Sequence, residues 1–233
     1  GNSFDIPFIK YRMKYYKIEN QIEKIDSFDI YREIKNNDSY LEFENLKLKT
    51  VEKNLGIYRN DKYSGKDCIN FYFEYINTKN INFKKNILEH NYDDLYYLLE
   101  IMKIFDILED IKTINIDLNE DKICIKILDM TVNEDVLNIH CKTTPINTNI
   151  IHYGENFNIK WQNTDSLMID LNIGEGLITP TKKALYVQKS KLSIDRNIKD
   201  LSEYMVPNDL ILLKVEKKWI MKNIKNIISQ LVL

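Results

Sequence analysis

Apolar residues recur at helical spacing near the middle of the chain and alternate with polar residues directly after it. The apolar residues between positions 91 and 111 form the stripe of one amphipathic helix. They are Leu95, Leu98, Leu99, Met102, Phe105 and Leu108. Residues 113–118, 122–130 and 135–141 alternate with period two, as strands with one buried face do. The pattern predicts a helix packed on an antiparallel β-meander, with the stripe buried against Ile114, Ile116, Ile123 and Ile125.

Weaker patterns flank this central stretch. Residues 8–34 have apolar side chains at helical spacing and predict a helix, and residues 39–51 and 69–76 alternate with period two and predict strands. After the meander, the same alternation predicts short strands at 149–154, 156–161, 166–173, 184–194 and 209–215. Many short strands at such spacing indicate a β-rich region that closes as a barrel or sandwich. The period does not decide whether 218–233 is a strand pair or a helix.

These elements predict an α+β fold that is rich in strand and has two domains. The asparagine-rich, polar stretch at 81–91 separates two patterned halves and is interpreted as a connector. The N-terminal α+β domain is therefore expected at 1–80 and the C-terminal domain at 92–233.

The charge of the chain restricts how it could bind a polyanion. Its 33 Lys and Arg residues nearly balance 35 Asp and Glu residues, which gives a net charge of −2, so binding to nucleic acid depends on local clusters of cations. Such a cluster occurs in the first predicted helix, at Lys10, Arg12, Lys14 and Lys17. A solvated helix face and a surface that contacts phosphates both explain this cluster.

Cysteine and histidine spacing argues against a metal site. The chain has three cysteines, Cys68, Cys124 and Cys141, and none of them is in CxxC spacing. This pattern predicts neither a disulfide framework nor a zinc site. It favours a reducing compartment, cytoplasmic or nuclear. His140 and His152 lack the paired spacing of tetrahedral ligands. No apolar run of about 18 residues and no leader pattern occurs, so no membrane partner is expected.

No catalytic signature of the GxSxG, HExxH or Walker kind is present. Asp93 and Asp94 suit the N-terminus of the predicted helix, where carboxylates cap the helix and complement its dipole. The missing set of nucleophile, base and orienting group predicts a non-enzymatic protein that uses no metal and no cofactor.

The order of elements from residue 91 to 141 resembles that of DNA sliding clamps, the ring-shaped processivity factors of replication. The segments that carry the resemblance are DDLYYLLEIMKIF, INIDL, NEDKICIKILDM and NEDVLNIHC, and residues 195–233 resemble the element that closes a clamp domain. The resemblance implies a homo-oligomeric ring that tethers a polymerase or repair protein to double-stranded DNA. Lys10, Arg12, Lys14 and Lys17 would then contact the DNA backbone, because the helix at 92–110 is acidic where clamps are basic.

An interaction or assembly protein of a phage or mobile element is the alternative. The segments NFNIKW and SLMIDLNIGEG resemble strands of a bacterial immunoglobulin-like sandwich, which implies no role with nucleic acid. Repeated helix-on-meander units would favour the clamp, whereas one sandwich beside unrelated segments would favour the assembly protein.

Overall fold

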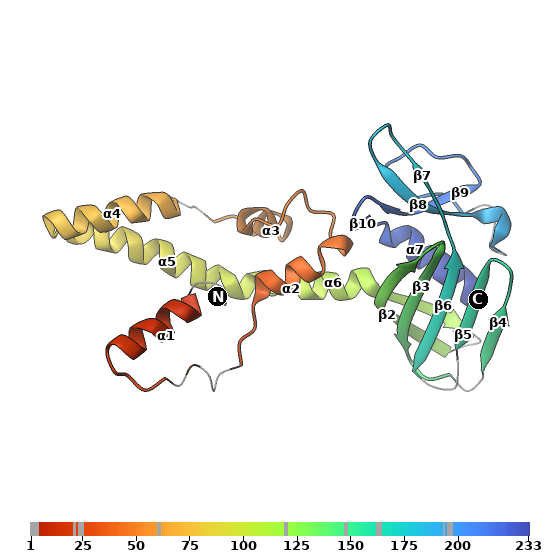
Figure 1. The fold of residues 1–233 in the computed structure, drawn as a ribbon, viewed down its shortest axis with the longest axis horizontal. Coiled ribbons are helices and arrows are strands. Elements are labelled where there is room, and N and C mark those ends of the chain that lie inside the picture. The colour runs from red at the N-terminus through yellow and green to blue at the C-terminus, as the bar shows by residue number, and fades with distance from the viewer. Residues whose placement is uncertain are drawn as a thin grey trace. The chain divides into compact units, whose positions relative to one another are not determined.

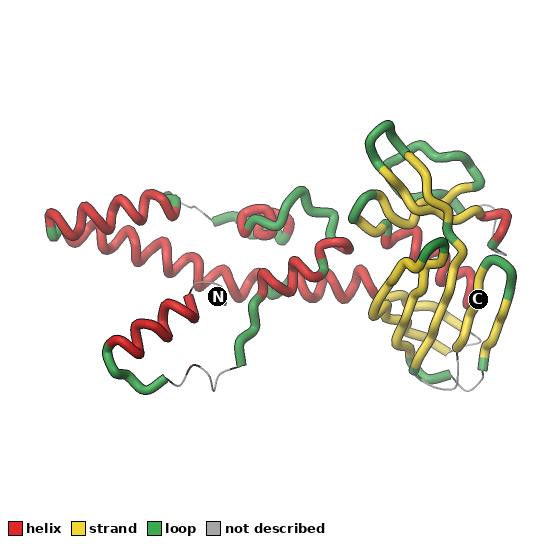
Figure 2. The backbone as a smooth tube through the Cα atoms, viewed as in Figure 1, coloured by secondary structure: helices red, strands yellow, loops and turns green. Residues whose placement is uncertain are grey.

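The chain divides into two compact units in the computed structural model (Figure 1). The helical unit runs to Asp38 and continues over Phe43–Met102, and the sheet unit consists of Ser39–Glu42 and Lys103–Leu233. Figure 2 shows that the described strands all lie in the second unit, whereas the first contains helices. The residues that the structure describes are 5–20, 22, 26–59, 62–118, 121–146, 149–161, 165–192, 194 and 198–233.

The helical unit is built from short N-terminal helices and one long antiparallel hairpin. The helices are α1 (Asp5–Tyr15), α2 (Ile30–Asn36), α3 (Leu48–Asn54), α4 (Gly65–Thr78) and α5 (Ile81–Ile101). A 3₁₀ turn, η2 (Asp38–Tyr40), follows α2 at the boundary of the unit.

Local capping explains why α4 and α5 form where they do. The Ser64 hydroxyl accepts a hydrogen bond from the amide of Asp67, and the Asp67 carboxylate accepts one from the amide of Ser64, which is the capping box of a helix N-terminus. Lys79 ends α4 in the left-handed conformation with φ of 56°. The Asn80 side chain then caps α5 by accepting from Asn82.

Two predicted strands in this region are wrong. Residues 69–76 lie within α4 and residues 39–51 form η2, a loop and the start of α3. The polar residues Asn70 and Glu74 are four apart, which fits one face of a helix as well as one face of a strand. The Ser64 capping box together with the packing of Phe71 on Phe83 of α5 favours the helix. The helix predicted at 8–34 ends at Tyr15, and residues 81–91, expected as a connector, form the first half of α5.

The sheet unit contains two antiparallel sheets and two helices. The larger sheet has the order β1-β2-β3-β6-β5-β4 and the smaller one β10-β9-β8-β7. The bounds of its elements are α6 Ile104–Lys112, β1 Thr113–Leu118, β2 Asp121–Asn133, β3 Val136–Thr143, β4 Ile150–Tyr153, β5 Phe157–Trp161, β6 Ser166–Asn172, β7 Gly174–Leu177, β8 Lys183–Gln188, η3 Lys189–Lys191, β9 Leu210–Val215, β10 Lys218–Trp219 and α7 Met221–Val232.

The predicted meander is confirmed. β1 pairs with β2 so that Ile114 lies opposite Ile125 and Ile116 opposite Ile123, and all four side chains are buried. The mixed α+β class is also confirmed. The sequence did not predict β7, and 218–233 forms the two-residue strand β10 followed by α7.

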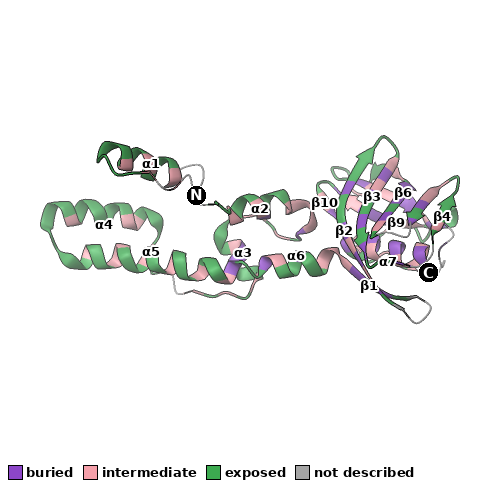
Figure 3. Ribbon diagram, turned by 90° about the horizontal axis from the view of Figure 1, so that it is seen from below, coloured by how far each residue is buried: buried purple, intermediate pink, exposed green. Residues whose placement is uncertain are grey.

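The core of the sheet unit joins both sheets through α7. This helix contacts β9 of one sheet and β1 of the other, and its apolar side chains Ile224, Ile227 and Ile228 are buried. A polar side chain of α7 is also built into this core: Asn223 donates to Asp200 and to the carbonyl of Leu212, and accepts from the amide of Leu201. In Figure 3 the buried residues gather in this unit.

The predicted burial of the central stripe is wrong for its first half. Leu108 of α6 is buried, but Leu95 is 70 % exposed and Leu99 is 76 % exposed. The reason is a turn at Met102 and Lys103 that separates α5 from α6, so that the single helix expected from the pattern is two helices in different units. A clamp-like arrangement of repeated helix-on-meander units is therefore not observed in the described residues.

Candidate functional site on the helical unit

A buried guanidinium joins three segments of the helical unit. Arg59 donates through Nε to Oε2 of Glu52 on α3 at 3.1 Å and through Nη1 to Oδ1 of Asp94 on α5 at 2.6 Å. The side chains of Arg59 and Glu52 are only 6 % and 4 % exposed. The Arg59 guanidinium also lies 5.9 Å from the ring of Tyr97. A buried charge network of this kind fixes its members in place, so the Asp94 carboxylate has a defined position.

Asp94 in turn faces a histidine one helical turn earlier. Its Oδ2 lies 3.6 Å from Nε2 of His90, since residues four apart occupy neighbouring positions on a helix. His90 is largely buried, whereas Asp94 is 42 % exposed. Arg59, Asp94 and His90 therefore form a chain in which a carboxylate held by a guanidinium orients an imidazole.

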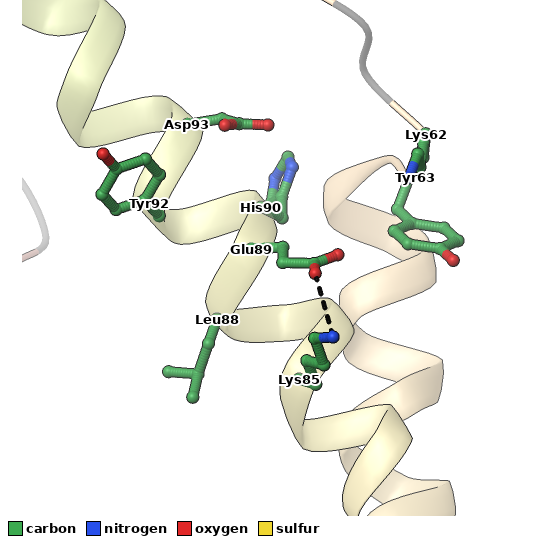
Figure 4. A pocket seen from close by; sticks show the side chains of 8 residues that line it. All are labelled: Lys62, Tyr63, Lys85, Leu88, Glu89, His90, Tyr92 and Asp93. Atoms are coloured by element: carbon green, nitrogen blue, oxygen red, sulfur yellow. Dashed lines mark ion pairs between the residues drawn. The ribbon is translucent and has the colours of Figure 1, made fainter.

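A cavity of about 480 Å³ opens next to His90. Its wall consists of Lys62, Tyr63, Lys85, Leu88, Glu89, His90, Tyr92 and Asp93. In the close view of Figure 4, Glu89, His90 and Asp93 project from one side of α5, whereas Leu88 and Tyr92 project from the other side. Lys85 forms a 3.9 Å ion pair with Glu89. The cavity thus combines two lysines, two carboxylates, a histidine and tyrosine hydroxyls.

These groups suit an anionic substrate that undergoes proton transfer. Lysines stabilise negative charge on a phosphate, and a histidine oriented by a carboxylate can accept a proton from an attacking hydroxyl. Cys68 on α4 is a poor nucleophile, because burial first and the charges of Asp67 and Asp94 next raise the pKa of its thiol. The His90 imidazole is therefore the better candidate for the reactive group.

The site does not fit a divalent metal by itself. Metal-dependent phosphodiester cleavage commonly uses ions held by several carboxylates, but within the described ranges no three His, Cys, Asp or Glu side chains are grouped to hold an ion. Asp94 is engaged by Arg59, which leaves one of its oxygens for other contacts.

The cations predicted to contact DNA lie on or just after α1. Lys10 and Lys14 are one helical turn apart on one face, and Lys17 follows the helix with φ of 56°. Arg12 falls on a different face, where it donates to the hydroxyl of Tyr16 at 3.0 Å and lies 4.8 Å from that ring. The structure does not bring these four residues into the wall of the cavity.

The other residues weighed from the sequence lie apart from one another. His140 is exposed on β3, Cys141 points into the core, and His152 on β4 stacks on Phe157. Asp93 and Asp94 lie in the second half of α5, so the interpretation that they cap a helix is wrong: the helix begins ten residues earlier than the pattern indicated. The spacing of His90 and Asp94 on one helix was the signal that could have identified the site.

Comparison with known proteins gives one match, and it covers the helical unit. Residues 1–105 match the family RNase_H_2, described as RNase_H superfamily, which is fewer than half of the 233 residues. No curated protein and no solved structure matches the chain. Across the part of the chain that the structure describes, no helix is long and apolar enough to cross a membrane.

This match overturns the sliding-clamp interpretation. The family that matches is an RNase H one and not a clamp family, and the apolar alternation that carried the resemblance is common to many meanders. The match also contradicts the prediction of a non-enzymatic processivity factor in DNA replication, because it points to nuclease chemistry. The finding lends no support to the assembly-protein alternative, and neither a ring nor a polymerase partner is shown.

Proposed function

We propose that this chain acts on phosphodiesters of nucleic acid, as part of a nuclease of the RNase H superfamily. The observation that carries the proposal is the position of the Arg59–Asp94–His90 chain. It lies inside the segment that matches the RNase H family, and it borders a cavity that holds Lys62 and Lys85. Both the match and the chemistry of the cavity indicate a phosphate-containing substrate.

In this proposal each residue of the site has one role. His90, held by Asp94 at 3.6 Å, takes a proton from the attacking water as the water oxygen bonds to phosphorus. The bond between phosphorus and the leaving oxygen breaks, and that oxygen takes up a proton from solvent. Lys62 and Lys85 bind the negative phosphate oxygens. Arg59 does not touch the substrate, because its guanidinium is buried between Glu52 and Asp94; it is a positioning residue.

The basic residues of α1 complete the proposal. Lys10, Arg12, Lys14 and Lys17 would contact the phosphate backbone outside the cleavage site, which gives affinity without sequence preference. Four such contacts predict a slope of about −3 to −4 for the logarithm of affinity against the logarithm of salt concentration.

Cleavage of labelled oligonucleotides tests the catalytic part. Single-stranded DNA, single-stranded RNA, duplex DNA and an RNA–DNA hybrid are incubated with the protein, with Mg²⁺, Mn²⁺ or chelator. We expect shortening of at least one substrate and a rate about 10²–10⁴-fold lower in His90→Ala, with a similar loss in Asp94→Asn. His152→Ala is the matched control, because it removes an exposed histidine of the sheet unit. Equal rates in His90→Ala and the wild type would refute the assignment.

Fluorescence anisotropy at several salt concentrations tests the binding part separately. Reversing Lys14 and Lys17 to glutamate should reduce the magnitude of the salt slope by about 2, while Lys191→Glu, an exposed lysine of the sheet unit, should leave it unchanged. A slope that stays the same in the α1 variant would exclude α1 as the contact, even if cleavage depends on His90.

A further inference from the structure

The solvent face of α5 carries a regular row of apolar side chains that nothing in the described structure covers. The row consists of Ile81, Leu88, Tyr92, Leu95, Leu99 and Met102, and the exposed fraction ranges from 39 % at Met102 to 76 % at Leu99. Together with Lys85 we call this row the α5 seam. Exposed apolar residues are common singly, but a continuous row along a helix marks an interaction surface.

The spacing of the α5 seam is that of a coiled coil. Successive members are separated by four and three residues in strict alternation over about three heptads. Ile81, Leu88, Leu95 and Met102 occupy d positions, and Lys85, Tyr92 and Leu99 occupy a positions. Tyr96 and Leu98 add exposed apolar side chains at the flanking e and g positions, so the exposed apolar row is centred on a and d, the contact positions of two paired helices.

We propose that α5 pairs with α5 of a second copy of this chain in a parallel two-stranded coiled coil. Leucine at the central d positions, Leu88 and Leu95, is the choice found in two-stranded coils. A single lysine at an a position, here Lys85, restricts register and number of strands at a cost in stability. The inference goes beyond the proposed nuclease function and does not depend on it.

The charges beside the α5 seam favour this partner and this orientation. Lys84 occupies a g position and Glu89 the following e position, and in a parallel pair the g residue of one helix faces that e residue of the other. Lys84 therefore meets the partner's Glu89, and twofold symmetry repeats the contact. A second copy supplies both charges of this contact at the matching heptad positions.

Pairing through the α5 seam leaves the other surfaces of α5 in place. α4 packs on a different face, through the stacked rings of Phe71 and Phe83 at 5.8 Å. His90 projects away from the side that carries Leu88 and Tyr92 (Figure 4). Lys85, Leu88 and Tyr92 belong both to the α5 seam and to the wall of the cavity, so pairing covers the cavity on that side and leaves His90 outside the contact.

Light scattering coupled to size exclusion measures the association. At tens of micromolar we expect twice the 27.8 kDa of one chain for the wild type. The double variant Leu95→Glu, Leu99→Glu should show the mass of one chain, with a dissociation constant raised about 100-fold or more, since like charges would face each other across the contact. Both leucines are exposed in one copy, so helicity by circular dichroism should be retained.

Ile69→Glu is the matched control, because Ile69 is an exposed apolar residue of α4 outside the α5 seam; this variant should remain a dimer. A wild type with the mass of one chain, or a dimer that persists in the double variant, would overturn the proposal.

Crosslinking of introduced cysteines tests the orientation. In a background with Cys68 and Cys124 changed to serine, Ile81→Cys and Met102→Cys should each form a disulfide with the same position of the partner, because equal positions meet in a parallel pair. Crosslinking only in a mixture of the two variants would indicate an antiparallel pair and would reject the arrangement proposed above.

Discussion

The two units of this protein bury their side chains in opposite ways. In the sheet unit, strands and α7 share one continuous apolar core, whereas among the described residues of the helical unit only Ile34, Val51 and Ile101 are buried apolar side chains. The helical unit instead buries a charge network around Arg59. The difference shows that the sheet unit is stabilised mainly by apolar burial, while the helical unit depends on polar contacts and exposes apolar surface that suits a partner.

Removal of the buried guanidinium should produce the largest effect. Arg59→Met leaves the carboxylate of Glu52 buried without its partner charge, which we expect to lower the free energy of unfolding of the helical unit by about 3–5 kcal/mol. Denaturant unfolding followed by helicity measures the loss. Lys53→Met, an exposed neighbour on α3, should change it by less than about 0.5 kcal/mol. A small effect of Arg59→Met would mean that the network does not hold the unit together.

A pair of leucine substitutions compares the units directly. Leu167→Ala on β6 empties a fully buried position and should cost about 2–5 kcal/mol. Leu99→Ala on α5 removes a side chain that is 76 % exposed, so in the monomer it should cost less than about 0.5 kcal/mol. Denaturant melts at a concentration below dimer formation provide both values. Equal losses would show that the stripe on α5 is covered even in one copy.

These contrasts explain which parts of the fold the sequence could predict. Every strand of the larger sheet except β4 has a buried face, and period two identified β1 to β6 as strands. The helical unit has no such constraint, and none of the residues 69–76 is buried. Its helix boundaries depend on Ser64, Asp67 and Asn80, which are single residues outside any periodic pattern.

Only part of the candidate site could be predicted from the sequence. His90 and Asp94 are one turn apart, so their contact follows once a helix is assumed. Arg59 is 35 residues from Asp94 in the chain, and Glu52 lies on a third element, so no spacing rule indicates that they meet. The cations of α1 could be identified from the sequence alone, because Lys10, Arg12, Lys14 and Lys17 are close together along the chain.

The polar contact inside the sheet unit should have an intermediate effect. Asn223→Ala removes the hydrogen bonds to Asp200, Leu201 and Leu212 and leaves buried partners unsatisfied, which we expect to cost about 1–3 kcal/mol. Asn226→Ala, on the exposed face of α7, is the control for helix propensity. A loss no greater than that of the control would contradict the assumption that this network fixes α7.

A pH-dependent effect is expected from the buried thiol of the sheet unit. Burial raises the pKa of Cys141 from 9.0 to about 12, so the folded state retains the proton longer than the unfolded state. The stability that the protonated thiol contributes is fully present below pH 9 and is lost as the pH rises towards 12. The free energy of unfolding then falls by about 1.4 kcal/mol per pH unit. The difference in slope between wild type and Cys141→Ala, measured from pH 8 to 10.5, gives this contribution. Parallel curves of unfolding free energy against pH for the two proteins would contradict this contribution.

The placement of the two tryptophans gives each unit its own spectroscopic signal. Trp161 and Trp219 both lie in the core of the sheet unit, and the chain has no other tryptophan, so indole fluorescence reports the melting of that unit alone. Ellipticity at helical wavelengths draws largely on α1 to α5. If the two signals change at different denaturant concentrations, the units unfold independently, and a single two-state transition does not describe the chain.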